Sequence, residues 1–237
     1  MRIVFTPGFM QPASAWEAVS AQLGERYSSV LLDHREHSFE GRVAELAEAG
    51  RGAVLCGYSL GGRLALHAAL RDPGAYAGLV TVGTSAGMEE PVMRAERART
   101  DEKLASWMET QPIDAIVDIW ERQPLFADQS DALVGAQRPG RLAQDPRSLA
   151  LILRTAGQGV LDPVWHRLTT LELPVLAMAG DRDRRYGDAA RRIAREVPDG
   201  RTEIVEHAGH APQLQQPDAV ARVLADFLDQ HFGQDVG

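Results

Sequence analysis

The chain of 237 residues has one cysteine, almost no lysine and no long apolar run. The single cysteine, Cys56, excludes an internal disulfide. No stretch approaches the roughly 20 apolar residues of a membrane span, so we expect no membrane partner. The N-terminal residues enter a predicted strand at once and offer no signal peptide, which favours a cytoplasmic protein. The formal net charge of −8 argues against a nucleic-acid partner.

What remains is a globular composition, 44% hydrophobic and 24% charged. Its most informative stretch is an apolar strand, residues 53–56, followed by the sequence GYSLG at residues 57–61 and then by a helical pattern. This is a G-x-S-x-G motif in the context that it requires, with a strand before it and a helix after it. Such a turn places Ser59 at the apex of a tight bend, and the two glycines supply the missing Cβ atoms. The motif therefore predicts a nucleophilic serine at the edge of a sheet.

Strand and helix patterns alternate along most of the chain. Six segments are expected to be strands: residues 2–6, 28–33, 53–56, 78–83, 173–179 and 202–206. Helices are expected at residues 15–23 (capped by Ser14), 39–49, 60–72, 188–197 and 217–232. This alternation implies the α/β class, with about six mostly parallel strands wound in a right-handed sense and helices on both faces.

The alternation of strand and helix patterns stops between residues 86 and 171, where no strand pattern occurs. Helical segments are expected there near residues 89–110, 112–121, 128–137, 147–156 and 162–170, with prolines such as Pro139 between them. An insertion at the carboxyl edge of a parallel sheet covers the place where ligands bind. We therefore expect a core of residues 1–85 and 172–237 and a helical cap of residues 86–171.

A nucleophilic serine needs a base, and the base needs an orienting acid. His210 lies in a loop after the last strand, at the same sheet edge as Ser59, and is favoured over His207, which could face the core. The acid should lie between serine and histidine in the chain. Asp183 is favoured because it lies further into its loop than Asp181, which is better placed to hold the turn.

The oxyanion that develops during such chemistry needs two backbone donors. We expect them at Leu60, directly after the serine, and at Phe9, in the loop after the first strand. Two histidine pairs are spaced by three residues, at residues 34 and 37 and at residues 207 and 210. No recognised metal motif accompanies either pair, so we expect no metal and no cofactor.

With these residues in place, the chain resembles the α/β-hydrolase superfamily along most of its length. Within it, the chain is most similar to the 2-succinyl-6-hydroxy-2,4-cyclohexadiene-1-carboxylate synthase family of menaquinone biosynthesis. The narrower resemblance rests on GYSLGGR at residues 57–63, on RAER at residues 94–97 followed by Asp101, and on WERQPLFA at residues 120–127. Arg138 falls near a further arginine of that family.

The resemblance implies a lyase that eliminates pyruvate from a small substrate rich in carboxylates, with serine and histidine acting as a base system and without an acyl-enzyme. It implies that Arg63, Arg97 and Arg138 bind the substrate, together with Tyr58 and Trp120. Guanidinium pairs with carboxylate through two parallel hydrogen bonds, so arginines suit such a substrate. Each arginine could instead be a surface residue, since arginine carries nearly all the basic charge of the chain.

The sequence departs from the family pattern at three loops that we expect around the rim of the site. Pro7 and Gly8 precede Phe9 where the family has His-Gly, and Asp33 is followed by HREHS. AGM at residues 86–88 replaces the family's Pro-Gly-Leu. These departures bear on the substrate more than on the fold.

Two other functions fit the same residues. A serine carboxylesterase or thioesterase would use the same triad on a small acyl compound, and an apolar pocket would favour it. A non-catalytic binding protein could keep the fold alone. The sequence leaves the oligomeric state, monomer or homodimer, open.

Overall fold

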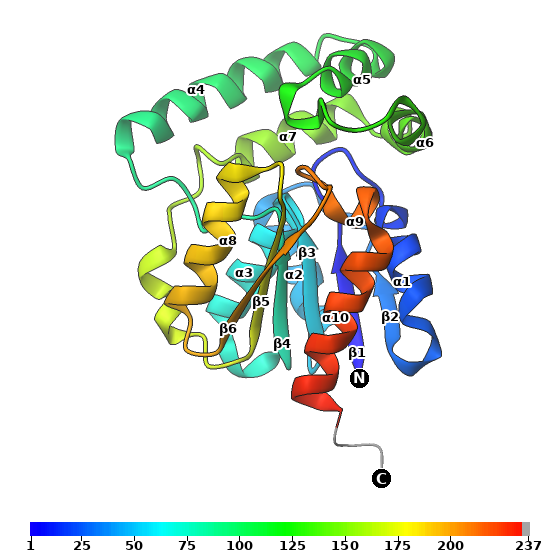
Figure 1. The fold of residues 1–237 in the computed structure, drawn as a ribbon. Helices are drawn as coiled ribbons and strands as arrows, with labels where there is room; N and C mark the ends of the chain where they lie inside the picture. The colour runs from blue at the N-terminus through cyan, green and yellow to red at the C-terminus, as the bar shows by residue number, and fades with distance from the viewer. Residues whose placement is uncertain (234–237) are drawn as a thin grey trace.

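The computed structural model describes residues 1–233 and contains one parallel sheet with helices around it (Figure 1). Its strands are β1 (Arg2–Thr6), β2 (Ser28–Leu31), β3 (Val54–Tyr58), β4 (Gly78–Val82), β5 (Val175–Gly180) and β6 (Gly200–Val205). Their order across the sheet is β2-β1-β3-β4-β5-β6, and every neighbouring pair is parallel. All six strands were expected from the sequence, and each lies within a few residues of its predicted position.

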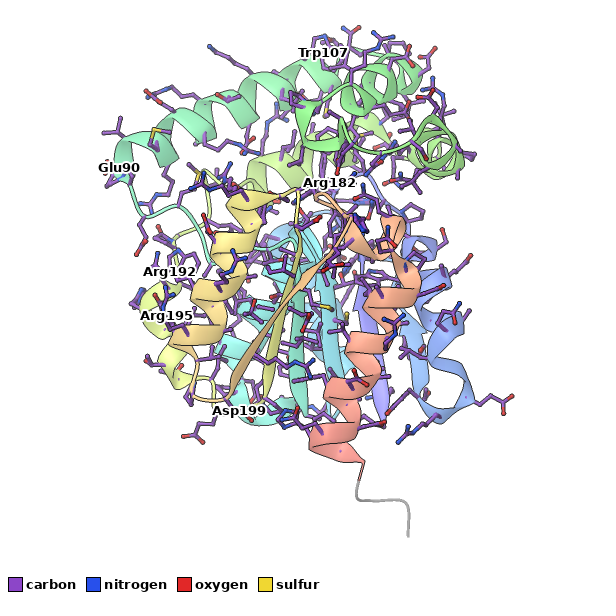
Figure 2. The ribbon with its side chains drawn as sticks, viewed as in Figure 1. Glu90, Trp107, Arg182, Arg192, Arg195 and Asp199 are labelled. Carbon is purple, nitrogen blue, oxygen red and sulfur yellow. The ribbon has the colours of Figure 1, made fainter. Side chains whose placement is uncertain are left out.

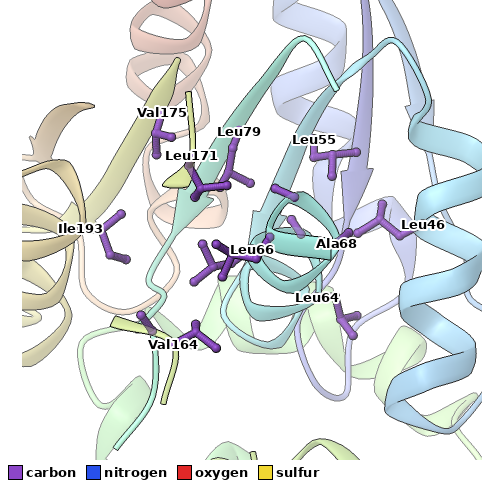
Figure 3. Packing of buried hydrophobic residues seen from close by; sticks show 14 of the residues in the cluster. Leu46, Leu55, Leu64, Leu66, Ala68, Leu79, Val164, Leu171, Val175 and Ile193 are labelled. Carbon is purple, nitrogen blue, oxygen red and sulfur yellow. The ribbon is translucent and has the colours of Figure 1, made fainter. Parts of the chain in front are cut away.

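The inner strands are buried on both faces because helices cover the sheet from both sides. The helices outside the cap are α1 (Glu17–Leu23), α2 (Phe39–Gly50), α3 (Leu60–Arg71), α8 (Arg184–Glu196), α9 (Pro212–Gln215) and α10 (Pro217–Phe232). One hydrophobic cluster joins the sheet to α2, α3 and α8 (Figure 3), and a second joins it to α1 and α10. The two clusters are the two halves of one core.

Four helices lie across the carboxyl edge of the sheet, and we refer to them as the cap helices (Figure 1). They are α4 (Pro91–Met108), α5 (Ile113–Glu121), α6 (Asp131–Leu142) and α7 (Pro146–Ala156). A third, smaller cluster joins α4, α5 and α7 and includes Met10 from the loop after β1. The cap helices thus pack directly on a loop of the sheet edge.

The two connections between the cap helices and the sheet lie side by side. Val164 donates a backbone hydrogen bond to Ala86, and the indole of Trp165 donates to the carbonyl of Gly87 at 2.9 Å. Arg192, labelled on α8 in Figure 2, has its guanidinium 3.9 Å from the centre of the Trp165 ring. It also pairs with Glu89. The chain therefore leaves the core and returns to it at one place.

Some element boundaries differ from those predicted. Ser14 is not a helix cap, because Ala13–Trp16 forms a 3₁₀ turn and α1 begins at Glu17. Pro139 does not separate two helices but lies inside α6. The backbone amide of Ala143 donates a hydrogen bond to the carbonyl of Pro139, so the helical hydrogen-bond pattern continues past the proline. The last expected cap helix is the 3₁₀ helix Trp165–Thr170.

Helix α8 begins four residues earlier than expected, because the side chain of Asp183 caps it by accepting from the amide of Tyr186. The short helix α9 was missed. None of the helices within residues 1–233 combines the length and the apolar character needed to cross a bilayer.

Candidate active site

Ser59 occupies the sharp turn between β3 and α3 with φ 50° and ψ −107°, a backbone conformation that residues other than glycine rarely adopt. A Cβ on Gly57 would lie 2.3 Å from the carbonyl oxygen of Gly61, and one on Gly61 would lie 2.4 Å from that of Thr6. Both contacts are with backbone, so no larger residue fits without moving a strand or a helix. The turn thus requires the two glycines that the motif supplies.

The structure brings Ser59, His210 and Asp183 together at the carboxyl edge of the sheet. The Nε2 atom of His210 lies 3.2 Å from Ser59 Oγ, and its Nδ1 atom lies 2.7 Å from Asp183 Oδ2. The imidazole is only 3% exposed. This geometry matches what a serine, a base and an orienting acid require of one another.

The two alternatives lie elsewhere. His207 is exposed to solvent and does not face the core, with a left-handed backbone at φ 59°. Asp181 accepts a hydrogen bond of 3.0 Å from the amide of Ala208 and so holds the turn of the histidine loop. Neither residue is in reach of Ser59.

A pocket of about 480 Å³ opens over Ser59, between the sheet edge and the cap helices. Phe9 and Leu60, the two expected backbone donors, both line it, and Leu60 is the first residue of α3. The amides at the start of a helix favour negative charge in front of them. The pocket therefore has a place for an anion next to the serine hydroxyl.

Two of the three predicted arginines line this pocket. Arg63, one turn into α3, donates a hydrogen bond of 2.6 Å to the carbonyl of Ala156. Burial lowers the pKa of Arg63 to about 10, with a smaller contribution from Arg97, and the side chain still carries its charge at neutral pH. Arg97 on α4 pairs with the nearly buried Asp101 at 2.7 Å and stays 37% exposed.

The structure does not bring Arg138 to the pocket. Its guanidinium donates to Asp118 and Glu121 on α5, at 2.6 Å each. The neighbouring Arg141, one turn further along α6, is instead buried and lies over the ring of Phe126 at 5.8 Å. It also pairs with Glu121 at 3.0 Å. Within the described residues, neither arginine is among those that line the pocket.

Aromatic side chains form one wall of the pocket. Trp120 packs edge-on against Phe9, with ring centres 5.1 Å apart, and against Phe126 at 5.7 Å. Tyr58 is buried with its ring centre 5.3 Å from that of His210, and burial raises the pKa of its phenol well above the usual range. Trp120 and Tyr58, both predicted, thus line the pocket, the first from α5 and the second from the end of β3.

Several residues that sequence reasoning missed also line the pocket: Gln11, Thr100, Asp101, Leu104, Gln158, Arg185 and Tyr186. The most closely placed is Tyr186, whose ring centre lies 4.5 Å from that of His210. Its position three residues after Asp183, on the first turn of α8, is a signal that could have found it. No sequence signal marks Gln158, which reaches the pocket from the loop after α7.

The three departures from the family pattern do not contribute to the pocket lining. In the described part of the chain, the residues that line the pocket do not include Pro7, Arg35, Glu36 or residues 86–88. The side chain of His34 is buried between the Thr6 hydroxyl at 2.8 Å and Glu45 at 3.1 Å. It is a structural contact between the loop after β2 and the end of β1.

The chain matches known proteins over most of its length. The model of the alpha/beta hydrolase family matches residues 3–223. A Bacillus subtilis (strain 168) protein, provisionally named 2-succinyl-6-hydroxy-2,4-cyclohexadiene-1-carboxylate synthase, is 31% identical in an alignment of 214 positions that covers 87% of this chain and 78% of the relative. The synthase of that name from Escherichia coli O1:K1 / APEC is 26% identical in an alignment of 240 positions that covers 95% of this chain and 93% of the relative.

Solved structures show the same architecture. MenH from S. aureus matches with a TM-score of 0.91 at 24% identity, covering 98% of this chain and 94% of that one. A thermophilic esterase from Thermogutta terrifontis matches with a TM-score of 0.82 at 19% identity, covering 98% and 90%. The predicted α/β-hydrolase fold is thereby confirmed. The two neighbours share this fold, although one is named MenH and the other an esterase.

Proposed function

We propose a reaction for this enzyme from the premise that the chain belongs to the alpha/beta hydrolase family. The proposed reaction is the elimination of pyruvate from a small substrate that bears carboxylates, as in the synthase of menaquinone biosynthesis to which the curated relatives are assigned by name. In this proposal Ser59, His210 and Asp183 are the catalytic residues, and residues 86–171 form a cap domain that closes over the substrate.

The observation that carries the proposal is the placement of two guanidinium groups in the pocket of Ser59. Arg63 and Arg97 both line it, on a protein whose net charge is −8. An anionic substrate approaching such a protein gains affinity only where local cations face it, and guanidinium binds carboxylate through two parallel bonds. The pair of arginines therefore supports a substrate with more than one carboxylate.

The geometry supports a base mechanism. His210 takes the proton of the Ser59 hydroxyl, Asp183 holds the imidazole in the tautomer whose Nε2 is free to accept, and the serine oxygen removes a proton from the substrate. The negative charge that develops on the substrate as its proton is removed is stabilised by the amides of Leu60 and Phe9. The bond to the pyruvyl group then breaks, and pyruvate leaves as its enolate, which takes up the proton held by His210. Trp120 and Tyr58 flank the reacting groups and exclude water.

Hydrolysis of a small ester or thioester is the second candidate, and one observation favours it. Much of the pocket lining is apolar or aromatic, with Leu104, Trp120, Phe126 and Leu153 among its residues. In that reaction the Ser59 oxygen attacks the acyl carbon and forms an acyl-enzyme, and the same two amides bind the oxyanion. The two candidates differ in substrate and in the covalent intermediate.

A direct assay separates them. Pyruvate release from the menaquinone intermediate is measured beside hydrolysis of a panel of neutral nitrophenyl esters. We expect pyruvate release, and we expect Arg63→Ala to lower kcat/KM for it by about 10- to 100-fold, the worth of hydrogen bonds to a charged group. Hydrolysis of a neutral ester should change little in the same variant.

Arg138→Ala is the matched control, because Arg138 lies on a cap helix but outside the pocket. It should leave both reactions within about twofold of the original chain. Equal losses on the charged and neutral substrates in Arg63→Ala would contradict carboxylate binding. Ester hydrolysis without pyruvate release would favour the esterase.

A further inference from the structure

The hydroxyl of Tyr186 is a buried polar group in the pocket that neither the triad nor the arginines use. Tyr186 is 5% exposed, lines the pocket with Ser59, and accepts a hydrogen bond of 2.6 Å from the side-chain amide of Gln158. Packing against His210 requires only the ring, which a phenylalanine would also supply. Burying a hydroxyl costs free energy unless its hydrogen bonds are made, so the presence of a hydroxyl at this buried position needs an explanation of its own.

The direction of the bond between Gln158 and Tyr186 follows from a third residue. Arg185 donates to the Oε1 atom of Gln158 at 3.3 Å. A guanidinium has donors and no acceptor, so the amide oxygen must face Arg185 and the amide nitrogen must face the phenol. The nitrogen donates, and the phenol oxygen is the acceptor.

The phenol proton is consequently left for another acceptor. Both nitrogens of His210 are engaged, one with Ser59 and one with Asp183, so the imidazole cannot take it. Among residues 1–233, the bond from Gln158 is the one hydrogen bond recorded at this oxygen. Tyr186, Gln158 and Arg63 all line the same pocket. The proton is therefore available to a ligand that occupies the pocket beside these residues.

We propose that Tyr186 is a substrate-binding residue whose hydroxyl donates a hydrogen bond to a substrate carboxylate held by Arg63, and that Gln158 and Arg185 are positioning residues for it. The inference rests on the proposed function in that it takes the substrate to be a carboxylate. Each donor in the series Arg185, Gln158, Tyr186 polarises the next, which strengthens the last bond to an anion. The hydroxyl and the guanidinium together provide donors for both oxygens of one carboxylate.

The first test removes the hydroxyl alone. Binding of phthalate, a six-membered ring with two adjacent carboxylates, is measured by isothermal titration calorimetry on the full chain and on Tyr186→Phe. We expect affinity to fall by about 10- to 100-fold, as for loss of a hydrogen bond to a charged group. Tyr76→Phe is the control, since Tyr76 is also buried but lies outside the pocket, and it should bind phthalate as the original chain does.

The second test reverses the bond. Gln158→Glu introduces a carboxylate that accepts the phenol proton and so withdraws it from the ligand. The added charge also repels an anion, and this repulsion is measured by making Gln158→Glu in the Tyr186→Phe background, where no phenol proton exists. We expect Gln158→Glu to weaken phthalate binding by about tenfold more in the original chain than in that background. Equal losses in the two backgrounds would overturn the assigned direction of the bond.

These measurements do not depend on turnover, so they separate the inference from the proposed reaction. Suppose that the original chain releases no pyruvate from the menaquinone intermediate but that Tyr186→Phe loses phthalate affinity. This result would uphold the carboxylate-binding role of Tyr186 and reject the lyase reaction. If the original chain binds phthalate no better than Tyr186→Phe does, the role of Tyr186 is rejected, whatever reaction the enzyme catalyses.

Discussion

Two histidines, His34 with its buried side chain and the partly buried His67, should make the fold sensitive to mild acid. Burial lowers the pKa of His34 to about 4, with Arg42 adding to the effect and the contact with Glu45 opposing it. Burial likewise lowers the pKa of His67 to about 4, with Arg71 contributing in the same direction. Both residues are neutral in the folded chain at pH 5, whereas a histidine of the unfolded chain is protonated there.

The sign and size of the effect follow from linkage. Between pH 6.5 and pH 4 the unfolded state binds more protons than the folded state, so stability present above pH 6.5 is lost as the pH falls toward 4. At pH 5 the loss is about 2 kcal/mol for each histidine, or about 4 kcal/mol for both. This is a large part of the roughly 5–15 kcal/mol of a typical domain. The pKa of Glu45 is itself lowered, so this carboxylate stays ionised at pH 5.

The assay is urea unfolding at pH 7 and at pH 5, followed by circular dichroism. His34→Gln and His67→Gln should each remove about half of the difference between the two pH values, and the double variant should remove nearly all of it. Only this difference is compared, because the substitutions also lower stability at both pH values through lost contacts. A difference below about 1 kcal/mol in the original chain, or one that survives the double variant, would refute the reasoning.

The remaining predictions concern the turn at the serine. Ser59→Ala should lower pyruvate release by about 10⁴-fold or more while the free energy of unfolding, measured in urea, changes by less than about 1 kcal/mol; full activity would exclude Ser59 from the mechanism. Gly57→Ala should destabilise the chain by about 3 kcal/mol or more, because its Cβ meets three backbone atoms within 2.5 Å. Gly135→Ala is the control on an open face of α6, where no atom lies within 4 Å, and should stabilise by up to about 1 kcal/mol. Similar effects of the two glycine substitutions would contradict the steric account.

The fold could be predicted because its signals are local. The four inner strands are short apolar runs, and the sharp turn at Ser59 needs glycines at two fixed positions, which the sequence shows directly. The placement of Asp183 and His210 beside the serine follows from topology, because the carboxyl ends of parallel strands meet at one edge. These inferences needed no knowledge of side-chain packing.

The place of Arg138 could not be predicted in this way. A helix ending before Pro139 would leave Arg138 in a loop, free to reach the pocket. Because α6 continues to Leu142, Arg138 is held on the side that faces α5, and Asp118 and Glu121 bind it. The position of the Arg138 side chain thus depends on how far α6 extends past Pro139, and helix propensities do not fix the last residue of a helix.

The bond between Gln158 and Tyr186 lay beyond sequence reasoning for a different reason. The two residues are 28 positions apart, on a loop after α7 and on the first turn of α8, and both are polar. Polar pairs at that separation leave no periodic pattern in the sequence. They are found only once the loop after α7 is placed against the sheet edge.

The adjacency of the two connections between sheet and cap has a consequence for how this enzyme can diversify. Since Ala86 and Val164 are joined by a backbone hydrogen bond, the intervening segment imposes no separation on β4 and β5, which pair with each other directly. The entropy of closing a loop grows slowly with its length. A longer, shorter or unrelated segment could therefore replace the residues between Ala86 and Val164 without changing the register of β4 and β5. Such a replacement would change the substrate range while Ser59, Asp183 and His210 keep their positions.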